Sequence, residues 1–270
     1  MFNKSLAAGM LCFLLFVSAF FLTGQASIYF NATAFIVVSS GTLGAGLLSS
    51  GPLRLRRALG FASQAYQEQQ GREKELIHSL LYLGQLYRSY GARHAQSTAQ
   101  KHPIISQALD LIKDGYKTKE IREILSTEAT VHARSRQELE KVFRNMSAYA
   151  PSFGVAGSVI GLVGLLMGIE ETSLILENVP VTLISTLYGI VLANFLLLPA
   201  AEKMRQEKER ELKQREIILC GALCISKGMD FLKMQRMLNS LVPEPGLRVE
   251  DPKTFRHIHT ALSKELGSKA

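Results

Sequence analysis

The sequence predicts an all-α polytopic membrane protein with four transmembrane helices and a helical cytoplasmic domain. Three observations predict this class: hydrophobic residues make up 47% of the 270 residues, they gather in long uncharged runs, and the basic residues lie outside those runs. The uncharged runs cover residues 5–51, 151–169 and 178–201. A bilayer core is crossed by about 20 apolar residues of helix, so the first run is long enough for two spans.

Taken in order, the runs predict two pairs of spans separated by a charged segment. We expect the spans at residues 5–24, 31–50, 151–169 and 179–199. The stretches "GQASIYFN" and "EETSLILEN" form the turn within each pair. The predicted domains are transmembrane helices 1 and 2 in residues 1–51, a cytoplasmic helical domain in 52–150, transmembrane helices 3 and 4 in 151–201, and a cytoplasmic C-terminal helix and tail in 202–270.

The basic residues predict the orientation, because cytoplasmic segments beside spans are enriched in Lys and Arg. Of the 31 Lys and Arg residues, one precedes the first span, 16 lie between the second and third spans, and 14 follow the fourth. The two short turns carry no basic residue. We therefore expect a multi-pass membrane protein whose two termini and middle segment face the cytoplasm.

Two competing interpretations are rejected. Residues 1–27 have the Lys, the apolar run and the small residues of a cleaved signal peptide. Cleavage would leave Arg54, Arg56 and Arg57 outside the cell, against the charge rule. The net charge of +8 invites a nucleic-acid interpretation, yet cations beside membrane helices more often set topology or contact anionic lipid.

The charged segments carry helical patterns of their own. An apolar stripe over residues 73–90 predicts an amphipathic helix. A second helix starts at Pro103 and stops before Gly115, a natural C-cap. A third runs from about Thr118 to Ala150, and the polar stretch "AEKMRQEKERELKQRE" continues the fourth span into the cytoplasm.

Pro151 and Pro199 stand where cytoplasmic helix meets membrane helix. Proline removes a helix hydrogen bond and kinks the axis. Two interpretations stay open: each proline ends a helix, or the two form a pair of hinges that link a membrane event to movement of the cytoplasmic domain.

The third span has glycine along one face. Spacings of 3, 4, 3 and 4 residues predict a stripe made of Gly154, Gly157, Gly161, Gly164 and Gly168. Small residues let helix backbones approach closely. We therefore expect this face to pack against another helix rather than lipid.

Hydroxyl side chains accompany that stripe. They are Ser158 on the third span and Thr182, Ser185, Thr186 and Tyr188 on the fourth. Each can bond to its own helix, or together they can line a path for a small cation or its water. The spans contain no Asp, Glu, Lys, Arg or His, so the titrating residue of an ion relay would lie on another subunit, whose helix would pack on the glycine face.

Other chemistry has little support. Cys12, Cys220 and Cys224 form no disulfide framework and too small a ligand set for a metal. We find no phosphate loop, no paired membrane carboxylates and no nucleophile with its base. We expect no enzyme activity, no metal site and no nucleic-acid partner.

Three stretches resemble the flagellar-motor stator subunit family of MotA and PomA. They are "APSFGVAGSVIGLVGLL", "PVTLISTLYGIVLANFLLLPAAEKM" and "ISQALDLIKDGY", and "FIVVSSGTLGAG" resembles the family's second helix. The order of spans and the loop sizes agree as well, so the likeness extends over nearly the whole chain. The "TLYG" with "LAN" and Pro199 carries most of its specificity.

The resemblance implies a homopentameric ring in the bacterial inner membrane around a single-span, peptidoglycan-binding partner of the MotB/PomB type. In that family the partner's membrane aspartate binds H⁺ or Na⁺, the transported ion, and the ring drives the rotor's switch-complex protein. Pro151 and Pro199 match the family's two prolines. Ser158 and Thr186 match its hydroxyl positions facing the aspartate, and the glycine stripe would form the wall around the partner's helix.

The chain departs from the family's pattern in its rotor-contacting loop. The family presents an Arg and, eight residues on, a Glu; here Arg88 matches the Arg, but Gln96 stands at the Glu position. Loss of that charge removes a long-range contact. In the third span, Ser158 keeps a hydroxyl where sodium-driven members tend to have Thr, which favours Na⁺ slightly.

Two other functions stay open at this point. One is an energiser of the TolQ/ExbB type, which acts on the envelope and usually has three spans with an outward N-terminus. The other is a structural membrane scaffold without ion flow, in which the hydroxyls and prolines serve only packing.

Overall fold

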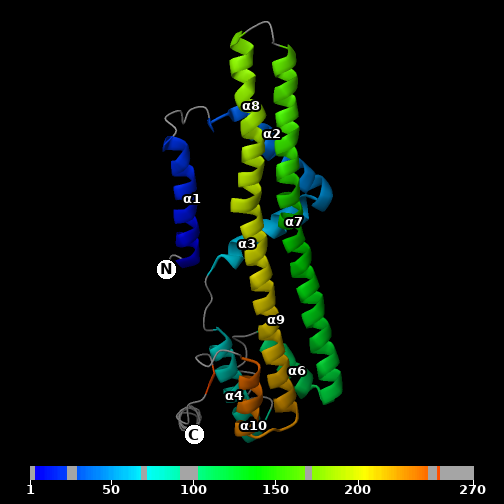
Figure 1. Cartoon of the computed structure of the whole chain (residues 1–270). Coiled ribbons are helices and arrows are strands. Elements are labelled where there is room, and N and C mark those ends of the chain that lie inside the picture. Colours follow the sequence, from blue (N-terminus) through cyan, green and yellow to red (C-terminus); the bar gives the residue numbers. More distant parts are fainter. Residues whose placement is uncertain are drawn as a thin grey trace, which may run out of the picture. The chain divides into compact units, whose positions relative to one another are not determined.

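The computed structural model describes residues 4–22, 29–67, 72–91, 103–167, 172–242 and 248–249, and every regular element in these ranges is helical (Figure 1). The all-α prediction is thereby confirmed. The elements are α1 (Lys4–Leu22), α2 (Ala32–Ser50), α3 (Pro52–Ala65), α4 (Arg72–Tyr90), α6 (Pro103–Lys113), α7 (Thr118–Met167), α8 (Thr172–Val191), the π-helical segment η2 (Leu192–Leu197), α9 (Leu198–Ser226) and α10 (Phe231–Ser240).

Within the described residues, three helices are long and apolar enough to cross a membrane. They contain the stretches Ala32–Ser50, Thr118–Leu166 and Thr182–Ser226. In the first expected span, α1 contains a shorter apolar stretch, Ala7–Ala19. The structure thus bears out membrane-spanning helices in the second, third and fourth expected positions.

The third span and the cytoplasmic helix before it form one helix. α7 runs for 50 residues with Pro151 inside it, so the interpretation that Pro151 ends a helix is wrong. An interior proline costs roughly 3 kcal/mol, and packing of α7 on both sides of Pro151 offsets that cost: Met146 and Ala150 are buried before it, and Gly154 after it.

The fourth span differs from its expected form at both ends. α8 begins at Thr172, so most of the expected turn "EETSLILEN" is helical. Near the other end, the six residues of η2 form a π-helical turn in which the Leu198 N–H donates to the Ala193 carbonyl. The wider turn lies directly before Pro199, whose ring would clash with a carbonyl four residues earlier in a regular α-helix.

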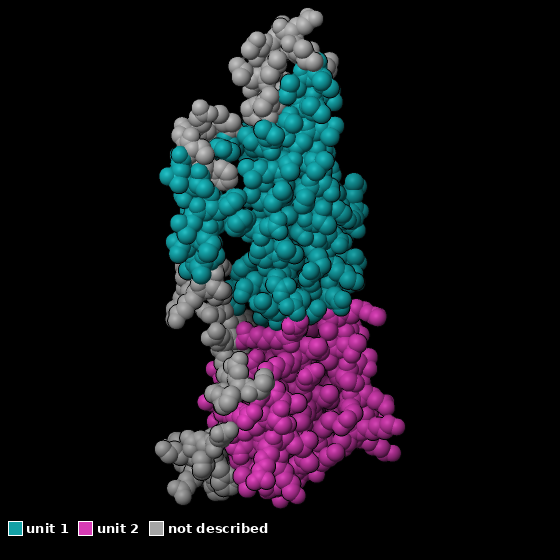
Figure 2. All heavy atoms as spheres, viewed as in Figure 1, with its two compact units in different colours: residues 1–68, 135–208 teal, residues 69–134, 209–270 magenta. Residues whose placement is uncertain are grey.

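The chain divides into two compact units (Figure 2). Unit 1 comprises residues 1–68 and 135–208, and unit 2 comprises residues 69–134 and 209–270. Both α7 and α9 contribute residues to each unit.

The core of unit 1 lies where α3 meets α7 and α9. Its members include Leu55, Ala58, Phe61 and Ala62 of α3, Val142, Phe143 and Met146 of α7, and Ala200, Ala201 and Met204 of α9. In Figure 1, α3 runs across the long helices rather than along them. α3 was not predicted, although Pro52 at its first turn and Gly51 before it, with φ of 76°, are local start signals.

The core of unit 2 is formed by α4, α6, α10 and the adjoining parts of α7 and α9. Among its fully buried members are Ile77, Leu81, Ile121, Ile217 and Leu238. The helices expected at residues 73–90 and from Pro103 are confirmed. Gly115 has φ of 82°, and the Tyr116 N–H donates to the Leu111 carbonyl at 3.1 Å, so the predicted C-cap is also confirmed.

Candidate functional site

The candidate site lies in unit 1, where α7 and α8 are in backbone contact. Gly154, Gly157 and Gly161 are buried on the face of α7 that meets α8. A Cβ added to Gly154 would lie 2.9 Å from the Ser185 carbonyl oxygen, and one added to Gly161 would lie 2.7 Å from the Thr182 nitrogen. These distances leave no room for a side chain, which explains the choice of glycine.

The contact is built from both helices. A Cβ added to Gly189 of α8 would lie 2.6 Å from the Ala150 carbonyl oxygen and 3.1 Å from the Cα atoms of Pro151 and Gly154. Small residues on each side therefore interlock, and α7 and α8 form a closely packed hairpin.

The glycine stripe does pack against a helix, as expected, but the partner differs from the expectation. At Gly154, Gly157 and Gly161 the neighbour is α8 of the same chain, so a partner subunit's helix cannot occupy these three positions. Gly164 is half-buried, and Gly168 lies outside the described residues. The exposed face of α7 is the opposite one, with Val155, Val159, Leu162 and Leu166.

Two of the predicted hydroxyls meet at this contact. The Ser158 Oγ and Thr186 Oγ1 atoms are 2.6 Å apart, and the Ser158 hydroxyl also donates to the Gly154 carbonyl at 3.2 Å. Both residues are half-buried. When Ser158 donates to its own helix, Thr186 donates to Ser158, and one lone pair on Ser158 and the lone pairs on Thr186 stay available to a cation.

The other predicted hydroxyls have different surroundings. Ser185 is fully buried against α7, and Thr182 is half-buried beside Gly161. The Tyr188 hydroxyl donates to the Tyr29 carbonyl at 2.5 Å and accepts from the Asn31 N–H at 3.1 Å. Tyr188 thus fastens the start of α2 to α8, a contact that the sequence pattern did not suggest.

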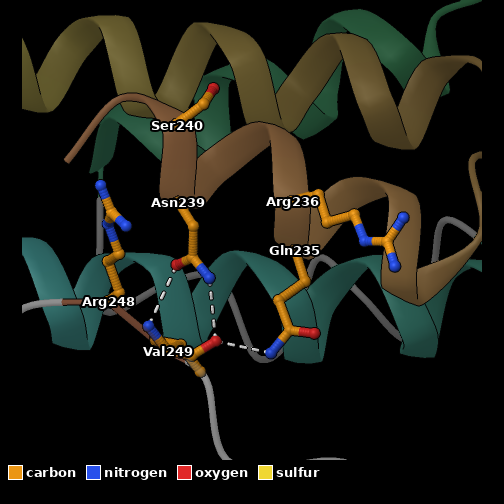
Figure 3. Close-up of a pocket in the computed structure, with 6 residues that line it drawn as sticks. All are labelled: Gln235, Arg236, Asn239, Ser240, Arg248 and Val249. Carbon is orange, nitrogen blue, oxygen red and sulfur yellow. Dashed lines mark hydrogen bonds between the residues drawn. The ribbon is translucent and has the colours of Figure 1, made fainter. Parts of the chain in front are cut away.

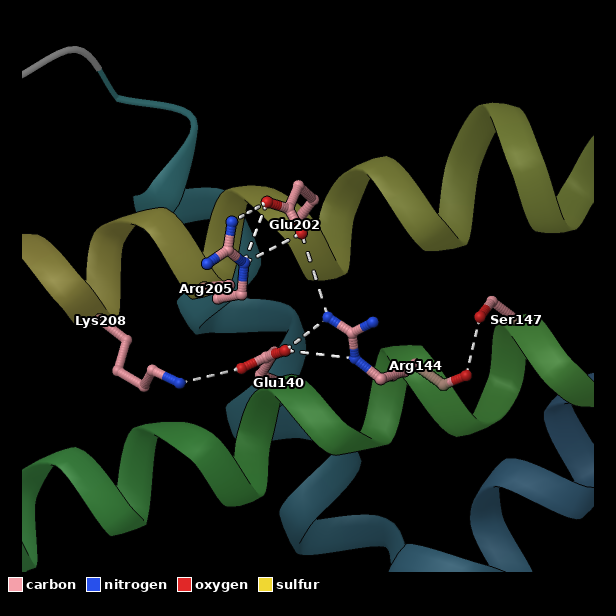
Figure 4. Close-up of polar contacts among 6 residues, drawn as sticks. All are labelled: Glu140, Arg144, Ser147, Glu202, Arg205 and Lys208. Carbon is pink, nitrogen blue, oxygen red and sulfur yellow. Dashed lines mark hydrogen bonds and ion pairs between the residues drawn. The ribbon is translucent and has the colours of Figure 1, made fainter.

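A charged cluster joins α7 to α9 within unit 1 (Figure 4). The Glu140 side chain is 7% exposed, and its carboxylate accepts from Arg144 at 2.8 Å and pairs with Lys208 at 3.3 Å. Next to it, hydrogen bonds from Arg205 hold the pKa of Glu202 below its ordinary range. The Glu140 and Arg144 spacing was visible in the sequence, but the partner on α9 was not.

Arg88, the predicted rotor contact, lies in unit 2 near the end of α4. Its guanidinium pairs with Asp230 at 3.2 Å, and both side chains are more than half exposed. The other oxygen of Asp230 accepts from the Leu232 N–H and caps α10. Gln96 lies outside the described residues.

Unit 2 also has an open hollow of about 500 Å³ beside α10 (Figure 3). The Asn239 amide exchanges two hydrogen bonds of 3.0 Å with the backbone of Val249, and Gln235 donates to the same carbonyl. These contacts hold residues 248–249 against α10. Within the described ranges no group of three or more His, Cys, Asp or Glu side chains is placed to hold a metal.

Cys220 and Cys224 are one turn apart on α9 in unit 2. The Cys224 thiol lies 3.9 Å from the Met237 sulfur, and its hydrogen bond to Cys220 lowers the pKa of Cys220 from 9.0 to about 7. The same bond, together with burial, raises the pKa of Cys224.

The chain is similar to several known proteins. Residues 96–217 match the family model described as the MotA/TolQ/ExbB proton channel family. The chain is 33% identical over 182 residues to motility protein A of Treponema phagedenis, covering 66% of this chain and 70% of that protein. It is 26% identical over 212 residues to the uncharacterized protein YtxD of Bacillus subtilis strain 168, covering 78% of each.

Two solved structures have the same fold. The structure of C. jejuni MotAB matches with a TM-score of 0.83 at 16% identity, covering 92% of this chain and 99% of that chain. The structure of the flagellar MotAB stator complex from Bacillus subtilis matches with a TM-score of 0.77 at 23% identity, covering 89% of this chain and 96% of that chain.

Proposed function

The chain belongs to the MotA/TolQ/ExbB proton channel family, and from this premise we propose that it is the ion-channel-forming stator subunit of a flagellar motor. In this role it couples the flow of H⁺ or Na⁺ to torque on the rotor. The similarity to motility protein A and to MotAB stator structures supports the proposal.

We place four spans in the bacterial inner membrane with both termini in the cytoplasm. Three candidate spans and the apolar helix Ala7–Ala19 support this count. The basic residues support the orientation, because residues 52–150 and 202–270 hold 30 of the 31. The segments 52–150 and 202–270 are then the cytoplasmic parts.

The partner is a single-span, peptidoglycan-binding subunit of the MotB/PomB type that supplies the ionisable group. The four spans hold no Asp, Glu, Lys, Arg or His, and both similar structures are of MotAB. The exposed apolar face of α7, opposite the glycine stripe, is available to this partner or to a neighbouring copy in the ring. Five copies form the ring, and the Arg88 region contacts the rotor's switch-complex protein.

The Ser158–Thr186 pair is the observation that carries the proposal. The two oxygens are 2.6 Å apart and half-buried in a hairpin whose other small residues are closely packed. Hydroxyl oxygens at such a site can replace water around a small cation as it leaves the partner's carboxylate. Pro151 and the π-helical turn before Pro199 lie at the inner ends of the same two helices, where they act as hinges that pass the movement to the cytoplasmic helices.

The test is leucine substitution of each hydroxyl. We expect Ser158→Leu and Thr186→Leu to abolish ion-driven swimming while the ring still copurifies with its partner, because leucine removes the oxygen and fills the path. Ser40→Leu on α2 is the matched control, since Ser40 is exposed and its hydroxyl bonds only its own helix.

Swimming should be measured in cells that express each variant from the native chromosomal locus. Copurification of the partner is measured in parallel. Normal motility in both leucine variants would overturn the ion-path assignment. Loss of motility in Ser40→Leu as well would show that any added bulk in the spans is harmful, and the pair would lose its special role.

A further inference from the structure

A basic groove in unit 1 is separate from the ion path. It lies where α2 ends and α3 begins, beside α7, and has a volume of about 420 Å³. Residues that line it include Ser50, Leu53, Arg54, Arg57, Ser135 and Glu138. Two arginines and two hydroxyls thus converge on one groove.

The groove has an excess of positive charge that the chain neutralises only in part. Arg54 pairs with Glu138 at 3.6 Å, but the two side chains are 53% and 44% exposed, and such exposed pairs contribute little. Glu138 also pairs with Lys141 at 3.6 Å. Within the described ranges no ion pair joins Arg57 to another residue, so its guanidinium is available to an anion.

Exposed apolar side chains lie on the same two helices, within two residues of residues that line the groove. Leu48 of α2 is 91% exposed, and Leu53 and Leu59 of α3 are 62% and 55% exposed. The groove also begins at the end of a candidate span, Ala32–Ser50. A helix with apolar and cationic side chains together beside a span is typical of a membrane interface.

We propose that the groove binds the phosphate of an anionic phospholipid headgroup, with Arg54 and Arg57 as its charged ligands and Ser50 and Ser135 as hydroxyl donors. A phosphate accepts from both guanidiniums and replaces the exposed Glu138 carboxylate at Arg54. A lipid, unlike a free anion, also covers Leu48 and Leu53 with its acyl chains. The inference rests on the proposed function in one respect, the placement of the end of α2 at the inner membrane surface.

The bound lipid has a structural consequence. α3 packs through Phe61 and Ala58 into the core that contains Met146 of α7 and Ala201 of α9. Met146 lies five residues before Pro151, and Ala201 lies two residues after Pro199. A headgroup that holds the start of α3 therefore anchors the region next to both prolines at the bilayer surface.

The test compares three arginine variants of the full-length chain, purified with its partner in a neutral detergent. Phosphatidylglycerol or phosphatidylcholine is titrated in, and the apparent Kd is read by native mass spectrometry. We expect Arg54→Gln and Arg57→Gln to weaken phosphatidylglycerol binding by about tenfold or more, as for one lost charge-assisted hydrogen bond. Arg56→Gln is the control: Arg56 is exposed on the same helix but does not line the groove, so we expect a change within about fivefold.

Three outcomes would overturn the proposal. Equal weakening in Arg56→Gln would mean diffuse attraction rather than a site, and equal binding of phosphatidylcholine would remove the role of headgroup charge. Displacement of the lipid by soluble glycerol phosphate at the lipid's own concentration would identify a free-anion site. Copurification of the partner is scored separately, so failure of the lipid site and failure of the stator assignment give different results.

Discussion

Glu140 is a carboxylate that is almost fully enclosed between α7 and α9. It binds Arg144 on its own helix and Lys208 on α9. The Lys208 side chain is 18% exposed, so its ammonium group depends on Glu140 to compensate for much of its lost hydration. A buried charge whose partner is removed destabilises a protein more than the intact pair stabilises it.

We expect Glu140→Ala to destabilise the purified complex by about 2–3 kcal/mol, somewhat less than for a fully buried pair because both cations keep some solvent. Glu138→Ala is the control on the same helix: its pairs are exposed, so the expected cost is within about 1 kcal/mol. Thermal unfolding of both variants checks the ranking. Equal Tm values for the two would contradict the role of burial.

Cys220 is expected to react as a thiolate near neutral pH. Its pKa is lowered to about 7 chiefly by the hydrogen bond from Cys224, so the reactive form predominates above that pH and is lost below it. In a Cys12→Ser background, alkylation of Cys220 should rise with pH through a midpoint near 7.

The donor at position 224 provides the matched comparison. Cys224→Ala removes the hydrogen bond to Cys220, while burial still raises the pKa of Cys220. The alkylation midpoint of Cys220 should therefore move up towards the ordinary value of 9.0. Cys224→Ser keeps a donor and should leave the midpoint near that of the unchanged pair. An unchanged midpoint in Cys224→Ala would show that the hydrogen bond does not set the pKa.

Among the helices, α7 and α8 pack closely because glycines let their backbones come into direct contact. Gly189→Ala adds a single methyl group where a Cβ would lie 2.6 Å from the Ala150 carbonyl oxygen. The helices must separate, and overpacking of this kind costs typically about 1–3 kcal/mol. We therefore expect a lower Tm and a weaker Ser158–Thr186 contact.

Gly44→Ala on α2 is the control for the same substitution. No atom lies within 4 Å of a Cβ added there, and alanine is the better helix former by about 0.5–1 kcal/mol. Its Tm should stay equal or rise slightly. A Gly189→Ala protein as stable as the Gly44→Ala protein would show that the hairpin adapts without cost.

At the scale of the whole molecule, the proposed four-span topology has a direct test. A protease-cleavable tag at the N-terminus should be cut in inside-out membrane vesicles and protected in spheroplasts. The reason is that four spans place Lys4 and the two basic segments on the cytoplasmic side, where Lys and Arg are enriched. Cleavage in spheroplasts would indicate an outward N-terminus and three spans, and would favour the TolQ/ExbB type of energiser.

Much of the fold follows from local and periodic signals. Neighbours within a few residues determine the second, third and fourth spans, the helix over residues 73–90 and the Gly115 cap, and these were predicted correctly. Of the two interpretations of Pro151, the helix end was wrong because packing along both sides of α7 outweighs proline's local cost. The π-helical turn before Pro199 was missed because no residue type is specific to it.

Three features could be read from the amino-acid order: the presence of membrane helices, the small residues on one face of the third span, and the hydroxyls beside that face. Two contacts became visible only in the folded chain: α8 covers Gly154, Gly157 and Gly161, and Glu140 meets Lys208, 68 positions away. The physical reason is that periodicity shows which face of a helix is small or apolar, whereas what covers that face depends on contacts between segments far apart in the chain.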